Sequence, residues 1–125
     1  MTEARQTLGA LGEQFARVYL EEKGMKFLEA NWRCRAGELD LLMQDGEVLV
    51  CVEVKSRRDS PWARRHLFDS ITFRKKKKLR TLAEIYQKVR FRFQKKPALR
   101  IDVVGVLLEP EAETASKIQH IRAAV

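Results

Sequence analysis

The stretch GELDLLMQDGEVLVCVEVK, residues 37–55, decides the fold of this chain. Asp45-Gly46 stands in it between two runs of apolar and β-branched residues, and an Asp-Gly pair in that position is the strongest short-range signal of a β-hairpin. We therefore predict two antiparallel strands, 38–44 and 47–55, joined by a two-residue turn at Asp45 and Gly46.

Charged side chains share one face of this hairpin. Side chains alternate faces along a strand, so Glu38 and Asp40 lie on one side of the first strand, as Glu53 and Lys55 do on the second. The predicted turn places Glu38 across from Glu53 and makes Asp40 a diagonal neighbour of Glu53. A slip of the register by two residues would leave all four on that face. Three carboxylates this close should raise at least one carboxyl pKa unless a cation neutralises them.

A divalent cation fits this arrangement. Mg²⁺ or Mn²⁺ binds through one or two carboxylates together with waters and phosphate oxygens. Held by Asp40 and Glu53, it would bind a scissile phosphate and help to ionise an attacking water, with Lys55 as a cationic partner. A solvated charged face on an ordinary hairpin produces the same alternation, so the pattern alone leaves both interpretations open.

Positive charge is concentrated in the middle of the chain. Residues 51–100 contain 17 Lys and Arg against 4 Asp and Glu, whereas residues 1–50 contain 6 against 9. A field of this sign attracts polyanions, either nucleic acids or acidic membrane surfaces. A phosphodiester substrate explains both the basic segment and the carboxylates, and this favours DNA as the partner, with RNA not excluded.

The remaining periodicity predicts an α/β class and a single domain over residues 1–125, a length usual for one domain. A helical stripe begins at Leu8 and stops at Gly24, and a second follows Ser70, a suitable N-cap. Glu13 lies off the main stripe of the first helix, on the line of Ala16 and Leu20, where a lone acid is usually solvated. The predicted elements outside the hairpin are helices 8–22 and 70–89 and strands 26–34, 99–108 and 118–123.

Cysteine usage and the N-terminus indicate the compartment. Cys34 and Cys51 have neither CxxC spacing nor nearby His pairs, so neither a zinc site nor a disulfide framework is indicated. Residues 1–7 lack the apolar core of a signal peptide, and no apolar run approaches the length of a membrane span. We expect a cytoplasmic protein with reduced thiols and no membrane partner.

Several motifs together resemble the YraN family of predicted endonucleases. That family is similar in fold to archaeal Holliday-junction resolvases, so the resemblance implies a restriction-endonuclease-like core, which is a mixed β-sheet flanked by helices. It covers most of the chain. The motifs are GELDLL at 37–42, VCVEVKSR at 50–57, Gly12-Glu13, Asn31, Lys75 and RIDVV at 100–104.

The resemblance also implies an active site with an Asp on one strand and Glu-x-Lys on the next, and these are Asp40, Glu53 and Lys55 here. Glu13 matches a helix acid that resolvase-like proteins place near the metal, so the implied metal ligands are Asp40, Glu53 and Glu13. The proline that often precedes the first motif acid is replaced by Gly37-Glu38-Leu39. Resolvase-like relatives act as dimers, which makes a homodimer one expected assembly.

Basic residues near the motif are candidates for contacts with phosphates, because Arg and Lys bind the nucleic-acid backbone. The main alternative to a nuclease is a non-catalytic basic module that binds nucleic acid without cutting it. The intact Asp40, Glu53 and Lys55 argue against that alternative. The candidate nucleic-acid-binding residues are Arg57, Arg58, Arg33, Arg35 and Lys75.

Overall fold

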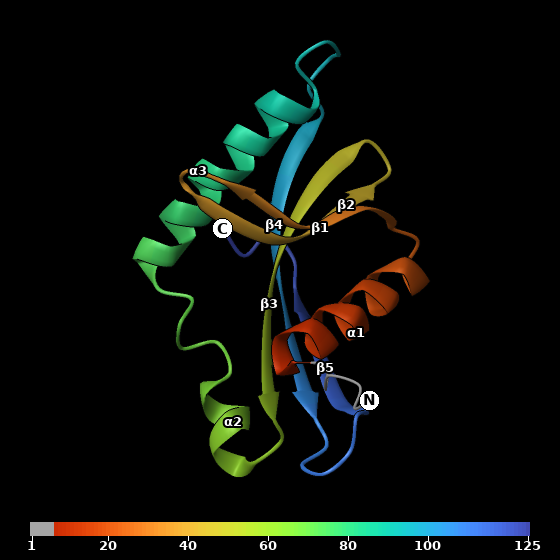
Figure 1. Ribbon diagram of the computed structural model, residues 1–125, viewed down its shortest axis with the longest axis vertical. Helices are drawn as coiled ribbons and strands as arrows, with labels where there is room; N and C mark the ends of the chain where they lie inside the picture. The colour runs from red at the N-terminus through yellow and green to blue at the C-terminus, as the bar shows by residue number, and fades with distance from the viewer. Residues whose placement is uncertain (1–6) are drawn as a thin grey trace, which may run out of the picture.

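A five-stranded mixed β-sheet with helices on both faces forms the centre of the protein, in a computed structural model that describes residues 7–125 (Figure 1). The α/β class and the mixed sheet flanked by helices are thereby confirmed. The elements are α1 (Leu8–Glu22), β1 (Lys26–Cys34), β2 (Gly37–Asp45), β3 (Val48–Arg58), α2 (Pro61–His66), α3 (Phe73–Arg90), β4 (Ala98–Leu108) and β5 (Ala115–Ile121).

The strands follow chain order across the sheet, β1-β2-β3-β4-β5. Neighbouring strands are antiparallel except β3 and β4, which are parallel. A parallel pair requires a crossover connection, and here the crossover contains α2 and α3. It carries α3 along one face of the sheet, while α1 packs on the other (Figure 1).

The core therefore has two layers, one on each face of the sheet. Alternate residues of β3 supply them: Val50 and Val52 pack toward α1, and Leu49 and Cys51 pack toward α3. This alternation is the one expected for a strand buried on both faces. From the helices, α1 contributes Leu11, Ala16 and Leu20, and α3 contributes Leu79, Leu82, Ala83 and Tyr86.

The hairpin of β2 and β3 is confirmed, but its register differs from the prediction by two residues. Asp45 pairs with Val48, so the turn residues are Gly46 and Glu47. Gly46 has a φ of +60°, and two-residue hairpin turns favour glycine where φ is positive. Continued toward the open end of the hairpin, this register places Asp40 directly opposite Glu53.

The helix boundaries also correct the sequence prediction. The short helix α2 was not predicted: Ser60 caps it and Pro61 occupies its first turn, a normal way for a helix to begin. Thr72, not Ser70, caps α3, because its hydroxyl accepts a hydrogen bond from Lys75 N at 3.1 Å. Both short-range caps satisfy main-chain donors at a helix start.

On α1, the buried face is rotated relative to the predicted stripe. Ala16 and Leu20, expected beside the stripe, are completely buried, whereas Val18 is exposed. The α1 face that meets the sheet therefore runs close to Glu13. Within residues 7–125, no helix combines the length and the apolar character that crossing a membrane would require.

Candidate active site

The strands β2 and β3 separate at Asp40. Their ladder runs from Asp45 paired with Val48 to Leu41 paired with Val52 and is not continued beyond that pair in the described residues. There the Asp40 carboxylate accepts a hydrogen bond from the Val54 main-chain N–H at 2.9 Å. A side-chain oxygen thus replaces the strand partner at the point where the sheet opens.

A polar pocket of about 380 Å³ occupies this opening. Strands β2 and β3 form its floor, and the first turns of α1 and α3 reach it from the two sides of the sheet. All four acids of the motifs, Glu13, Glu38, Asp40 and Glu53, line it together. The lining residues are Leu8, Gly9, Glu13, Glu38, Asp40, Glu53, Val54, Lys55, Ser56, Arg57 and Lys75.

Two ammonium groups meet the Glu53 carboxylate. Lys75 Nζ lies 3.0 Å and Lys55 Nζ 3.7 Å from Glu53 Oε2, and the Glu53 side chain is only 5% exposed. A buried carboxylate needs such partners, because desolvation of an unpaired charge is expensive. Lys75 was expected to contact nucleic acid, and in the structure it lines the pocket itself and pairs with Glu53.

Asp40 is the most perturbed acid of the pocket. Burial raises its pKa to about 7, helped by repulsion from Glu53 and by a hydrogen bond between the two carboxyl groups, while the bond from Val54 N–H acts in the opposite direction. Because its pKa is raised to about 7, Asp40 holds a proton at acidic pH, and a divalent cation bound there would displace it.

The raised pKa of Asp40 makes the stability of the protein depend on pH in a specific way. The pKa of Asp40 rises from 3.8 to about 7 on folding, so between these values the folded protein holds a proton that the unfolded chain releases. The resulting stabilisation is complete below pH 3.8 and is lost as the pH rises toward about 7. Asp40→Asn removes this contribution.

The expected result is that the unfolding free energy of wild type relative to Asp40→Asn declines across that range, by at most about 1.4 kcal/mol per pH unit. Urea titrations in EDTA at several pH values measure it. Parallel stability curves for the two proteins would contradict the raised pKa of Asp40.

Glu13 reaches the same pocket from α1. Burial raises its pKa, repulsion from Glu38 and Glu53 adds to the increase, and a hydrogen bond with Asn31 opposes it. Asn31, whose side chain makes this bond to Glu13, has an unusual main-chain conformation with a φ of +55°. The helix acid inferred from the resemblance thus faces the acids of the hairpin.

The remaining basic candidates divide into two groups. Arg57 lines the pocket, but Arg58 points away from it, since its Nη1 donates to the carbonyl oxygens of Glu109 and Ala112 in the β4–β5 connection. The alternation of side chains along β3 explains this separation. Arg58 is therefore assigned to that connection and not to the pocket.

Arg33 and Arg35 are both exposed on the β1–β2 hairpin. Arg33 Nε forms an ion pair with Glu38 at 2.9 Å. This pair lies at the surface, where it contributes little to stability.

Gly12 and Ser56 were not recognised from the sequence as parts of the site. A Cβ on Gly12 would lie 1.7 Å from Ser56 Oγ, so only glycine lets α1 approach β3 this closely. Ser56 Oγ is buried and has no hydrogen-bond partner among residues 7–125. A glycine in the middle of a helix, which normally weakens it, was the signal available.

Comparison with known sequences identifies the family. A sequence model of the uncharacterised protein family UPF0102 matches residues 12–106. The chain belongs to the UPF0102 family. It is 43% identical over 115 residues to a UPF0102 protein of Renibacterium salmoninarum, which covers 92% of each chain. A UPF0102 protein of Pelotomaculum thermopropionicum is 41% identical over 96% of each chain. The resemblance to the YraN family is thus confirmed as UPF0102 membership.

The UPF0102 match begins at Gly12 and includes every acid and lysine of the pocket. Among residues 7–125 of this UPF0102 protein, no three His, Cys, Asp or Glu side chains stand together as a ready set of metal ligands. Asp40 and Glu53 nevertheless fit Mg²⁺ or Mn²⁺, because these ions bind proteins through one or two carboxylates and take their other ligands from water and phosphate.

Proposed function

We propose that this UPF0102 protein is a metal-dependent endonuclease that hydrolyses phosphodiester bonds in DNA. One observation carries the proposal: the carboxyl groups of Asp40 and Glu53 line one polar pocket with Lys55, whose Nζ lies 3.7 Å from Glu53 Oε2. Perturbed acids with a specific charge partner in a cleft are a recurring property of catalytic sites. The mixed sheet with α1 and α3 on opposite faces fits the restriction-endonuclease-like core, which we propose with it.

Each residue of the pocket has a role in this reaction. Asp40 and Glu53 would hold Mg²⁺ or Mn²⁺, which supplies Lewis acidity at the phosphate and favours ionisation of a bound water. Lys55 lies near Glu53 and would orient the attacking water or neutralise charge that develops on the phosphate. Arg57, at the edge of the pocket, would bind a neighbouring phosphate.

A panel of labelled DNA substrates tests the proposal. Single-stranded, duplex, flapped and four-way forms are incubated with Mg²⁺, Mn²⁺ or EDTA, and products are resolved on denaturing gels. We expect cleavage of at least one form that requires a metal and is abolished by EDTA, because the carboxylates cannot activate water without one. If no form is cut with either metal, the proposed function is wrong. RNA versions of the same forms measure the preference for DNA.

A second candidate function is a basic module that binds nucleic acid without cutting it. The ion pair between Lys75 and Glu53 at 3.0 Å favours this alternative, because it neutralises Glu53 without a metal. The two candidates differ in one measurable property. Titration of the protein with Mn²⁺ should release a proton from the pocket if a metal displaces it and should release none if Lys75 is the permanent partner.

A further inference from the structure

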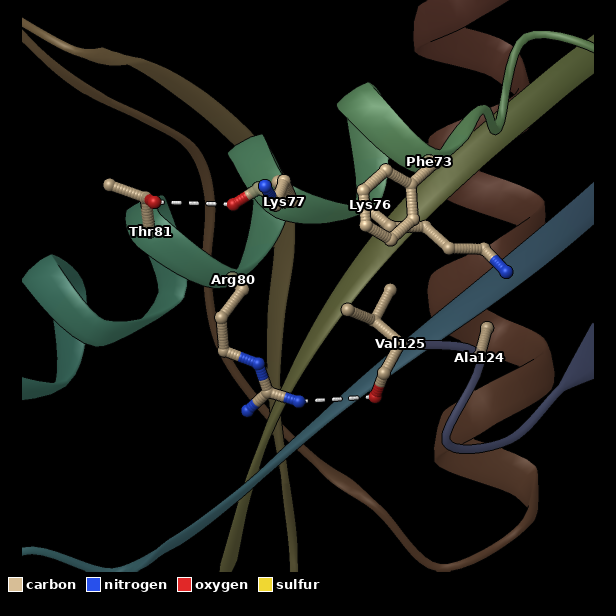
Figure 2. A pocket seen from close by; sticks show the side chains of 7 residues that line it. All are labelled: Phe73, Lys76, Lys77, Arg80, Thr81, Ala124 and Val125. Atoms are coloured by element: carbon tan, nitrogen blue, oxygen red, sulfur yellow. Dashed lines mark hydrogen bonds between the residues drawn. The ribbon is translucent and has the colours of Figure 1, made fainter.

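A second cavity, of about 700 Å³, lies between the N-terminal half of α3 and the last residues of the chain (Figure 2). Phe73, the first residue of α3, lines it and is 74% exposed. Three cationic side chains also line it, and no Asp or Glu does among the residues that the structure describes. The lining residues are Phe73, Lys76, Lys77, Arg80, Thr81, Ala124 and Val125.

Different faces of α3 line the candidate active site and the second cavity. Lys75 contacts Glu53 and Leu79 is buried in the core, so this side of the helix faces the sheet. Residues three or four positions apart share a face, which places Phe73, Lys77 and Arg80 together on another side. Arg80 turns toward the end of the chain, where its Nη2 donates to the main-chain oxygen of Val125 at 3.1 Å (Figure 2).

This cavity lies close to the candidate active site. Val103 is the residue of β4 that pairs with Glu53, and neighbouring strands lie about 4.8 Å apart. Val103 lines a smaller cavity of about 180 Å³, which shares Lys76 and Ala124 with the larger one. The two cavities therefore lead from the strand beside Glu53 to the exposed ring of Phe73.

The chemistry of the residues that line the cavity indicates which ligand it binds. Exposed aromatic rings bind nucleic-acid bases by stacking, without regard to sequence, while nearby Lys and Arg bind phosphates. Lys77 Nζ lies 5.1 Å from the centroid of the Phe73 ring, so aromatic and cationic groups are adjacent. Only an unpaired base can reach such a ring, because the bases of a duplex are stacked on one another inside it.

We infer that this cavity binds a single-stranded segment of the DNA substrate, with a base stacked on Phe73 and phosphates bound by Lys76, Lys77 and Arg80. The inference rests on the proposed nuclease function and specifies its substrate class. The strand cut beside Glu53 continues into an unpaired segment at Phe73, as in flapped, gapped or branched DNA.

Binding measured without metal tests this inference apart from cleavage. Fluorescence anisotropy in EDTA compares the whole chain and its variants on a labelled oligothymidylate and on a blunt duplex of equal length. Phe73→Ala should weaken binding to the single strand by about tenfold, the effect of losing one base–aromatic stack, and leave the duplex affinity unchanged. Phe73→Trp should restore the affinity for the single strand.

The matched control is Phe93→Ala. Phe93 is 86% exposed and also lies beside a cation, with Arg92 4.6 Å from its centroid, but it is outside the cavity. This variant should bind both DNA forms as wild type does. Because both phenylalanines are exposed, the variants should have the same melting temperature as the wild-type protein.

Three results would overturn the inference: an unchanged affinity for the single strand in Phe73→Ala, an equal loss in Phe93→Ala, or an equal loss of binding to polyglutamate, which would assign the cavity to acidic peptides. A protein that cuts duplex DNA without dependence on Phe73 would retain the proposed function and lose this inference. Dependence on Phe73 in a protein that cuts nothing would support the cavity and overturn the nuclease.

Discussion

Asp40→Asn is expected to lower the metal-dependent cleavage rate by roughly a thousandfold or more, as the loss of a group acting directly in catalysis does. The fold should survive, since the amide oxygen of Asn can still accept the bond from Val54 N–H that the carboxylate accepts at 2.9 Å. Removing the charge weakens metal binding and also lessens repulsion of the DNA backbone. Metal-free affinity for DNA should therefore hold or rise.

Lys55→Ala, unlike Asp40→Asn, should separate cleavage from metal binding. It should lose most of the cleavage yet keep its metal affinity, because Lys55 is not a metal ligand, and its DNA affinity should fall by no more than one phosphate contact. Lys88→Ala, at an exposed position in the last turn of α3, is the matched control for the loss of one positive charge.

Single-turnover cleavage, calorimetric titration with Mn²⁺ and metal-free DNA binding on the same preparations measure these effects. A basic module without catalysis predicts instead that Lys55→Ala loses affinity and that no variant has activity to lose. If Asp40→Asn and Lys55→Ala both cut as fast as wild type, the proposed mechanism is wrong.

Gly12→Ala is expected to destabilise the protein by about 3 kcal/mol, at the upper end of the usual cost of overpacking a core. The added methyl would lie 1.7 Å from Ser56 Oγ and 2.7 Å from Ser56 Cβ, so α1 must move away from β3. That movement would also displace Glu13 from the pocket. Urea unfolding monitored by circular dichroism measures the loss.

The neighbouring Gly9 provides the control on the same helix. A Cβ there meets nothing within 4 Å, so Gly9→Ala should be neutral or stabilising by about 0.5–1 kcal/mol through helix propensity alone. In a double-mutant cycle, Ser56→Gly should relieve the damage caused by Gly12→Ala, because it removes both clashing atoms. Equal stabilities of Gly12→Ala and Gly9→Ala would disprove the close contact.

The sequence predicted the hairpin and the face that its charges share because both depend on short-range rules: turn chemistry and the two-residue period of a strand. The period placed Glu53 and Lys55 on one side of β3, where their charged atoms lie 3.7 Å apart, and Asp40 lines the same pocket. These rules could not reveal that Lys75 pairs with Glu53, because that contact joins residues far apart in the chain.

Two other features could not be predicted from the pattern of the sequence, for similar reasons. The separation of β2 from β3 depends on how the sheet twists, and it places Leu39 in the α3 core with Leu42 although strict alternation assigns these residues to opposite faces. The burial of Ala16 depends on which side of α1 meets the sheet, and small side chains carry a weak hydrophobic signal.

The backbone at Asn31 affects more than the position of Glu13. Strand β1 is an outer strand of the sheet, and a long regular outer strand invites pairing with another molecule and aggregation. Asn31 interrupts it with a φ of +55°, and an irregular register between Phe27 and Glu29 bends it a second time. With two interruptions in nine residues, β1 is a poor template for pairing with a strand of another molecule. The segment that orients Glu13 therefore also protects the protein against aggregation.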